Sequence, residues 1–135
     1  MTKPIRVTAA IMAKTNQVFA ARRNPDTHMA GFWEFPGGKI EVGETPEVCL
    51  ARELLEEFGI VTQVGAFLGD STYDYGTKTV QLLAYEVTHL SGDFELRAHD
   101  ELRWLALDEL DQVKWAPADI PLVALYKKLA RRRLD

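Results

Sequence analysis

Runs of apolar residues, separated by short polar segments, divide this chain into strands. The clearest run is KTVQLLAYEVT at residues 78–88, which is rich in aliphatic and β-branched side chains. Near the N-terminus two further runs flank Thr15 and Asn16, a pair that favours a tight turn between antiparallel strands. The pattern predicts strands at residues 4–13, 17–22, 61–69, 78–88 and 102–107.

Two other segments have a helical pattern. Thr45 suits an N-cap and Pro46 the first helical position, while Gly59 suits a left-handed helix end. We therefore expect a helix over residues 46–58. A closing helix is expected over residues 119–133, where four apolar residues form one stripe, namely Leu122, Leu125, Tyr126 and Leu129. Loops are expected at residues 23–32, 73–76 and 90–99, and a helical turn at residues 107–110.

The order of these elements predicts an α/β sandwich, with a helix on each side of a mixed sheet. The length of 135 residues, 47% of them hydrophobic, fits one domain spanning residues 1–135.

The helix over residues 46–58 carries an acidic group of side chains. Glu53, Glu56 and Glu57 are spaced i, i+3 and i+4, which places the three carboxylates on one helix face. We expect the core to contact the opposite face, formed by Val48, Ala51, Leu55 and Phe58. Neighbouring like charges destabilise a helix, so a compensating divalent cation with oxygen ligands is expected.

The charge balance supports the same chemistry. Residues 38–60 hold six glutamates against Lys39 and Arg52, a net charge of −4 that equals the net charge of the whole chain. An acidic patch repels polyphosphate unless metal ions bridge carboxylates and phosphate oxygens. The pattern therefore indicates metal-assisted phosphoryl chemistry.

Composition narrows the cellular setting and the partners. The single cysteine excludes an intrachain disulfide, and neither a signal peptide nor a membrane span is evident, so we expect a cytoplasmic protein with no membrane partner. The basic C-terminus is explained by the helix dipole, and the acidic balance argues against a polynucleotide partner.

A spaced motif joins these features. Gly38 is followed after five residues by Glu44, and after seven more by Arg52-Glu53-Leu54. Glu56-Glu57 and Gly59-Ile60 complete the spacing. This pattern matches the Nudix box at every position, and the chain resembles the Nudix hydrolases, which cleave nucleoside diphosphates linked to another moiety. The resemblance implies an α/β/α sandwich over essentially the whole chain.

The resemblance also implies functional roles. Mg²⁺, for which Mn²⁺ may substitute, would be held by the Gly37 carbonyl with Glu53, Glu56 and Glu57. Arg52 would position the glutamates through ion pairs. Either Glu53 or Asp100 would orient or deprotonate the attacking water, and Glu101 is the alternative to Asp100 as an additional acidic ligand. His99 is a weaker candidate for a general base.

The segments around the box are similar to the MutT branch and to the bacterial CTP pyrophosphohydrolases. By this resemblance Arg23 contacts substrate phosphates, His28 lies near the nucleotide, and Lys78 approaches the substrate. Glu34 and Phe35 would line the base pocket. Asp119 stands where the MutT enzyme has an asparagine that recognises the base, and the run APADIPL is more similar to the CTP pyrophosphohydrolases.

We therefore expect an Mg²⁺-dependent enzyme that hydrolyses a free nucleoside triphosphate to the monophosphate and pyrophosphate. An ionised Asp119 favours CTP, dCTP or a 5-modified cytosine form, and the alternative is a MutT-type 8-oxo-dGTP diphosphatase. A hydrolase of ADP-ribose or dinucleotides and a non-catalytic ligand-sensing domain are the rivals. The first usually carries extra sequence and the second usually loses box glutamates. We expect a monomer rather than a homodimer.

Overall fold

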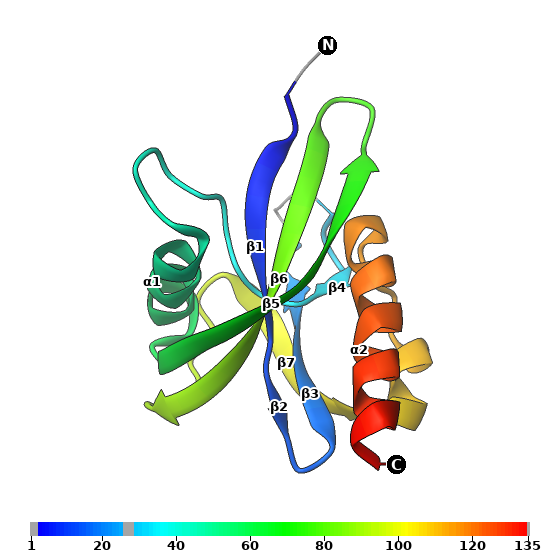
Figure 1. Cartoon of the computed structure of the whole chain (residues 1–135). Coiled ribbons are helices and arrows are strands. Elements are labelled where there is room, and N and C mark those ends of the chain that lie inside the picture. Colours follow the sequence, from blue (N-terminus) through cyan, green and yellow to red (C-terminus); the bar gives the residue numbers. More distant parts are fainter. Residues whose placement is uncertain (1–2, 26–28, 135) are drawn as a thin grey trace.

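The computed structural model describes residues 3–25 and 29–134 of the chain (Figure 1). Helices α1 (Pro46–Phe58) and α2 (Ile120–Leu134) lie on opposite sides of the strands. This arrangement confirms the α/β sandwich. The strands are β1 (Ile5–Ile11), β2 (Ala13–Lys14), β3 (Gln17–Arg23), β4 (Trp33–Glu34), β5 (Val61–Asp74), β6 (Thr79–Ser91) and β7 (His99–Ala106). Two 3₁₀ helices, η1 (Leu107–Gln112) and η2 (Pro117–Asp119), precede α2.

The strands form two sheets. In the first, β6 pairs in parallel with β1 and antiparallel with β5, so this sheet is mixed. In the second, β3 pairs antiparallel with β2, β4 and β7. The predicted turn joins β2 to β3, with φ angles of 50° at Thr15 and 62° at Asn16, as a two-residue type I′ hairpin requires.

Helix α1 begins and ends where the sequence predicts. The Thr45 hydroxyl accepts a hydrogen bond from the Val48 N–H, and Gly59 ends the helix in the left-handed region at φ 71°. Its buried face differs from the expected one. Cys49, Leu50, Leu54 and Phe58 are buried, whereas Val48 and Leu55 are more than half exposed.

Because the buried face of α1 differs from the expected one, its carboxylates also lie in a different place. Successive residues of a helix are turned by about 100° around its axis, which places Glu53 and Glu57 between the directions of Cys49 and Leu54. Because Cys49 and Leu54 are buried, the two glutamates lie on the buried side of α1. The prediction that the acidic face lies opposite the core is therefore wrong. The two glutamates instead border the core at a cavity.

Two apolar clusters hold the layers together. One lies under α1 and contains Phe19, Leu54 and Phe58, with the Phe19 and Phe58 rings packed edge to face at 5.3 Å. The other lies under α2 and contains Trp115 and Leu122. No helix among residues 3–25 and 29–134 is long and apolar enough to cross a membrane.

Several boundaries differ from the predicted ones in ways that matter for function. Strand β5 runs to Asp74, through part of the expected 73–76 loop, because it pairs with β6 along its length. Strand β6 likewise extends to Ser91. Strand β7 begins at His99 rather than residue 102 and pairs with β3 from its first residue. That early start brings His99 beside Arg23.

Candidate active site

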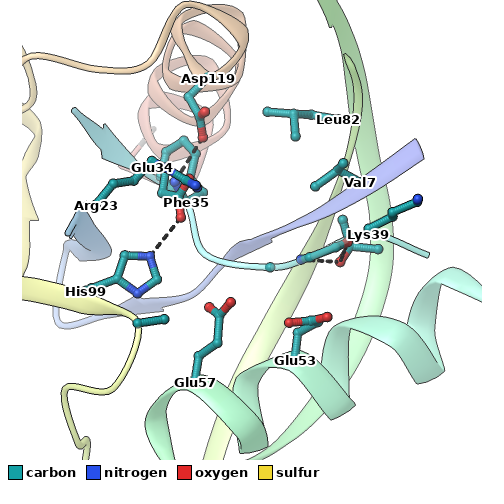
Figure 2. A pocket seen from close by; sticks show the side chains of 14 residues that line it. Val7, Arg23, Glu34, Phe35, Lys39, Glu53, Glu57, Leu82, His99 and Asp119 are labelled. Carbon is teal, nitrogen blue, oxygen red and sulfur yellow. Dashed lines mark hydrogen bonds and ion pairs between the residues drawn. The ribbon is translucent and has the colours of Figure 1, made fainter. Parts of the chain in front are cut away.

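A cavity of about 350 Å³ lies between α1, the segment that follows β4, the start of β7 and the end of η2. Figure 2 shows Glu53 and Glu57 rising from α1 on one side, and Glu34, Phe35 and Asp119 on the other. Most of the predicted site residues line it, namely Arg23, Glu34, Phe35, Gly37, Glu53, Glu57 and Asp119. Segments far apart in the sequence thus converge on one space.

Two glycines let the chain pass close to the floor of this cavity. A Cβ atom on Gly37 would lie 1.9 Å from the carbonyl oxygen of Thr8, and one on Gly38 would lie 2.1 Å from the carboxyl carbon of Glu53. The Thr8 neighbour is strand backbone and cannot shift easily, whereas the Glu53 side chain would have to leave its observed position. Gly38 is therefore a steric requirement for the observed placement of Glu53, and Gly37 for the close approach to β1.

Arg52 fixes the acidic residues of the motif relative to one another. Its Nε and Nη2 donate to the two carboxylate oxygens of Glu44 at 2.7 and 2.9 Å. Its Nη1 donates to Glu53 at 3.0 Å and to Glu56 at 3.2 Å. The Arg52 guanidinium holds the pKa of Glu44 down at about 2. Arg52 is thus paired with three of the acidic residues of the motif, Glu44, Glu53 and Glu56.

The negative charge of Glu57 is the least compensated by neighbouring donors among the carboxylates of α1. Burial, followed by the charges of Glu34 and Glu53, raises its pKa to about 8. In the described part of the chain its buried Oε2 has no hydrogen-bond partner. Burial also raises the pKa of Glu53. An unpaired buried carboxylate oxygen of this kind is suited to a cation ligand.

Glu56 is placed differently. Its side chain is 57% exposed, it pairs with Arg52, and it is not among the residues that line the cavity. Among residues 3–25 and 29–134, no three acidic, histidine or cysteine side chains are already grouped around a single metal position. The structure thus brings Glu53 and Glu57 together, and leaves Glu56 at the rim.

Glu34 is a buried carboxylate whose charge is compensated. Its Oε1 accepts from Arg23 Nη1 at 2.9 Å, and its Oε2 lies 2.8 Å from His99 Nε2 (Figure 2). Burial by itself would raise its pKa, but the hydrogen bond from His99 and the charge of Arg23 outweigh burial and hold the pKa of Glu34 below its usual range. Glu34 therefore remains ionised beside Glu57.

Asp119 is directed across the cavity rather than along its own helix. It is 4% exposed, and its Oδ2 accepts from the backbone N–H of Phe35 at 2.9 Å. A helix N-cap would instead accept from an N–H of its own helix. Burial and the charge of Glu34 raise the pKa of Asp119 well above its ordinary value. The side chain is thus fixed at the end of the cavity that is remote from α1.

A smaller cavity of about 130 Å³ adjoins the first and shares Arg23, Glu34 and Asp119 with it. Lys78 and Tyr75 complete its polar lining. The Tyr75 hydroxyl accepts from the backbone N–H of Ala118 at 3.1 Å, which ties the two sides of this cavity together. A flat group placed here would contact Asp119 while its substituents extend toward Glu53 and Glu57.

Besides Arg52 and Glu56, two predicted acidic residues line neither cavity. Asp100 accepts from Arg22 Nε at 2.7 Å and lines neither cavity. Its alternative Glu101 pairs with Arg22 at 3.5 Å and with Arg103 at 2.5 Å. His28 lies outside the described residues.

The match with known proteins identifies the family. A family model described as the NUDIX domain matches residues 2–126. The chain belongs to the Nudix family. A CTP pyrophosphohydrolase of Escherichia coli K12 is 35% identical over 131 residues, covering 97% of each protein. An 8-oxo-dGTP diphosphatase of the same organism is 34% identical over 128 residues, covering 94% of this chain and 99% of the relative.

Solved structures agree with this membership. The solution structure of the E. coli ORF135 protein has a TM-score of 0.85 and 35% identity, with 97% of this chain and 94% of that chain covered. A MutT protein of methicillin-resistant Staphylococcus aureus has a TM-score of 0.76 and 36% identity, with 96% and 99% covered. The chain is a Nudix hydrolase of the MutT type, acting on phosphoric anhydride bonds.

Nudix hydrolases generally use divalent metals such as Mg²⁺, and the residues of this cavity fit such an ion. The buried Oε2 of Glu57 has no donor within the described chain, and Glu53 and Gly37 line the same space. All are oxygen ligands, which Mg²⁺ prefers.

Three residues of this Nudix site were missed or underrated from the sequence. Lys39 and Thr8 line the cavity, although neither was considered as a site residue. The position of Lys39 directly after the two glycines was the available signal. His99 was considered only as a base, whereas the structure pairs it with Glu34.

Proposed function

We propose that this Nudix hydrolase converts a free nucleoside triphosphate to the monophosphate and pyrophosphate, with a cytosine nucleotide preferred. The observation that carries the proposal is a pair of adjoining cavities with unlike ends. Glu53 and Glu57 form the acidic end beside Arg23, and Asp119 forms the other end in the adjoining cavity. A triphosphate fits the first end and a base fits the second.

At the acidic end Mg²⁺ would be held by Glu53, Glu57 and the Gly37 carbonyl, with Glu56 near the rim. When bound, the ion would neutralise phosphate charge and favour deprotonation of the attacking water. Arg23 binds phosphate oxygens on the opposite wall, and Lys39, which lies on the side of Glu53, adds a second positive charge to the cavity (Figure 2). Mn²⁺ substitutes for Mg²⁺ because its ligand preference is similar.

Glu53 is the general base in this proposal. Arg52 Nη1 holds its Oε1 at 3.0 Å, and the side chain lines the cavity. A water oxygen forms a bond to phosphorus, its proton passes to Glu53, and the bridging P–O bond between the α and β phosphates breaks. Asp100, the alternative base, is held by Arg22 outside the cavity. Its placement therefore favours Glu53.

Asp119 supplies the base preference. Cytosine presents an N4 amino donor next to an N3 acceptor. An ionised Asp119 accepts from N4, and a protonated one accepts from N4 while donating to N3. Cytosine thus pairs with either form. The first relative described above is itself a CTP pyrophosphohydrolase, which supports the same preference.

The second candidate is an 8-oxo-dGTP diphosphatase. Guanine O6 accepts hydrogen bonds, so only the protonated Asp119 has a donor for it. The buried position of Asp119 favours that form, since burial raises its pKa. Hydrolysis of 8-oxo-dGTP should then fall as pH rises through the pKa of Asp119, while hydrolysis of dCTP persists.

The proposal requires a single chain acting on free nucleotide. We infer that a monomer carries out this reaction. We infer that the enzyme acts in the cytoplasm, where free nucleotides are found.

A substrate panel tests the proposal. CTP, dCTP, 5-methyl-dCTP, dGTP and 8-oxo-dGTP are assayed with pyrophosphate and orthophosphate measured separately. Pyrophosphate with monophosphate is expected, and release of orthophosphate with a diphosphate would refute the reaction type. In Asp119→Asn the amide oxygen would take the Phe35 N–H, so that the NH2 group faces the base; activity on dCTP should fall and activity on 8-oxo-dGTP should rise. A wild type that strongly prefers 8-oxo-dGTP would instead establish the second candidate.

A further inference from the structure

His99 is a buried polar side chain that the proposed chemistry does not use. It is 5% exposed, and its ring stacks on Phe58 at 5.2 Å with an interplanar angle of 14°. One ring nitrogen, Nε2, lies 2.8 Å from Glu34 Oε2. The other, Nδ1, is buried with no hydrogen-bond partner in the described part of the chain. A histidine in such a place requires a reason beyond packing, because an apolar residue would pack there without that cost.

The partner of His99 links it to the cavity. Glu34 has one oxygen on His99 and the other on Arg23 Nη1, at 2.8 and 2.9 Å. The side chain of His99 is 3% exposed, that of Glu34 16% and that of Arg23 32%. The three residues thus form a linked series, His99–Glu34–Arg23, that lines the cavity and in which Arg23 is the most exposed (Figure 2).

The strands explain why these three residues meet. Arg23 ends β3, Glu34 lies in β4, and His99 begins β7, and β4 and β7 both pair with β3. The β3–β7 register shifts between Arg22 and Arg23, so that Arg22 pairs with Glu101 and Arg23 with His99. This bulge passes over Asp100, which binds Arg22 instead. It therefore selects which arginine enters the cavity.

We propose that His99 is a positioning residue, which donates its Nε2–H to Glu34 and thereby holds Arg23 in the orientation that binds the substrate phosphates. This rests on the proposed function in one respect only, the phosphate-binding role of Arg23. Because Nε2 donates to a carboxylate, the neutral ring carries its proton on Nε2 and leaves Nδ1 as an acceptor. His99 does not touch the substrate in this proposal.

The surroundings make this donor necessary. Glu34 lies close enough to Glu57 and Asp119 for its charge to act on both of these buried carboxyl groups. Without His99, one oxygen of Glu34 would be buried with no donor in an acidic cavity. Glu34 would then turn toward Arg23, and the guanidinium would leave its phosphate-binding orientation. The loss should appear mainly in substrate binding rather than in the chemical step.

Two substitutions separate positioning from packing. His99→Leu keeps an apolar side chain on Phe58 but removes the donor, whereas His99→Gln keeps a side-chain N–H donor for Glu34. We expect His99→Leu to raise the KM for dCTP roughly 10- to 100-fold, the range of a hydrogen bond to a charged group, with kcat changed less than about threefold. His99→Gln should restore most of the loss. His89→Gln is the matched control, because His89 lines neither cavity and should leave KM unchanged.

A double-mutant cycle tests the connection to Arg23. In an Arg23→Ala background, His99→Leu should raise KM by less than about threefold, because the residue that it positions is gone. Equal effects of Leu and Gln, a fall in kcat at unchanged KM, or additive effects of His99→Leu and Arg23→Ala would each overturn the proposal. Circular dichroism of each variant checks that a change in KM does not reflect unfolding.

A measurement without turnover keeps this inference separate from the proposed function. In ¹⁵N-labelled protein, the Arg23 guanidinium resonances should show restricted rotation in the wild type and in His99→Gln, and averaged signals in His99→Leu. A wild type that neither binds nor hydrolyses a triphosphate would refute the proposed function, while these resonances would still decide whether His99 holds Arg23. Unchanged Arg23 resonances in His99→Leu would refute the positioning role.

Discussion

The two glutamates on either side of the cavity, Glu34 and Glu57, are chemically alike but held in opposite ways. Glu34 has a donor for each oxygen, and its pKa is held below the usual range despite burial. Glu57 has a buried oxygen without a donor in the described chain, and its pKa is raised to about 8. Burial is common to both. The difference is therefore made by the neighbours, His99 and Arg23 on one side and acidic groups on the other.

This comparison separates structural carboxylates from functional ones. A carboxylate whose oxygens both accept hydrogen bonds from the protein is held in a fixed position. A carboxylate with an oxygen that lacks a donor favours a ligand that supplies positive charge. The Glu34 side thus orients Arg23, while the Glu57 side is completed only by what binds to it. Each experiment below tests whether the two sides differ in this way.

Removal of divalent metal should have the largest effect. Exhaustive EDTA treatment should abolish dCTP hydrolysis, because Glu53 and Glu57 then repel the phosphates that Arg23 attracts. Addition of Mg²⁺ or Mn²⁺ in the millimolar range should restore it. Pyrophosphate release is the measurement, and turnover that persists in EDTA would contradict the metal role of the acidic side.

Loss of single carboxylates should come next. Glu53→Gln and Glu57→Gln should each lower kcat roughly 10²-fold or more, the scale of a lost general base. Glu56→Gln should have a smaller effect, since Glu56 is exposed and paired with Arg52. Glu47→Gln, an exposed position in the first turn of the same helix, is the control and should retain the wild-type rate. Near-wild-type rates for both Glu53→Gln and Glu57→Gln would show that the acidic side is misassigned.

The acidic side was also the part of the site best predicted from the sequence. Thr45, Pro46 and Gly59 are local signals, and they set the ends of α1 correctly because capping depends on neighbours in the chain. The motif spacing then placed Glu53 and Glu57 on one helix. The buried face was misassigned, because Val48 and Leu55 are apolar but are not covered by the sheet.

The side of the cavity that contains Glu34 was harder to predict, because it is formed by contacts between segments that are distant in the sequence. The bulge between Arg22 and Arg23 decides that His99 faces Glu34 while Asp100 binds Arg22, and a strand register cannot be read from either segment alone. Sequence similarity therefore indicated an acidic residue at Asp100, and the structure places a histidine in the cavity instead. Asp119 likewise has its hydrogen-bond partner, the Phe35 N–H, 84 residues away in the sequence.

Substitution of Gly38 should have an effect of intermediate size on the catalytic rate. Gly38→Ala would place a methyl group 2.1 Å from the Glu53 carboxyl carbon, so that either Glu53 or the loop must move. We expect kcat to fall roughly 10- to 100-fold, since a displacement of about 1 Å at a catalytic group has effects of this size. Gly43→Ala is the control for strain alone, because Gly43 has a positive φ but no atom within 4 Å of an added Cβ. A larger loss of kcat in Gly43→Ala than in Gly38→Ala would mean that loop strain, rather than displacement of Glu53, controls the rate.

The smallest expected effect concerns stability and pH, and it contrasts the two glutamates directly. Glu57 has a folded-state pKa of about 8, above the ordinary value of 4.5, so between these values the folded protein binds more protons than the unfolded chain. In metal-free protein the stabilising contribution of Glu57 to the free energy of unfolding is complete below pH 4.5 and is lost as pH rises to 8. Glu57→Gln should remove this pH-dependent loss in the free energy of unfolding, which we expect to be on the order of 1–3 kcal/mol after relaxation of the cavity.

Glu34→Gln should instead destabilise the protein by about 1–3 kcal/mol near pH 7, because a neutral amide pairs less well with Arg23 and His99. Urea unfolding at pH 5 and pH 8 in EDTA measures both variants against the wild type. A wild type whose stability relative to Glu57→Gln is the same at both pH values would show that Glu57 is compensated as well as Glu34 is, and the difference between the two sides would then disappear.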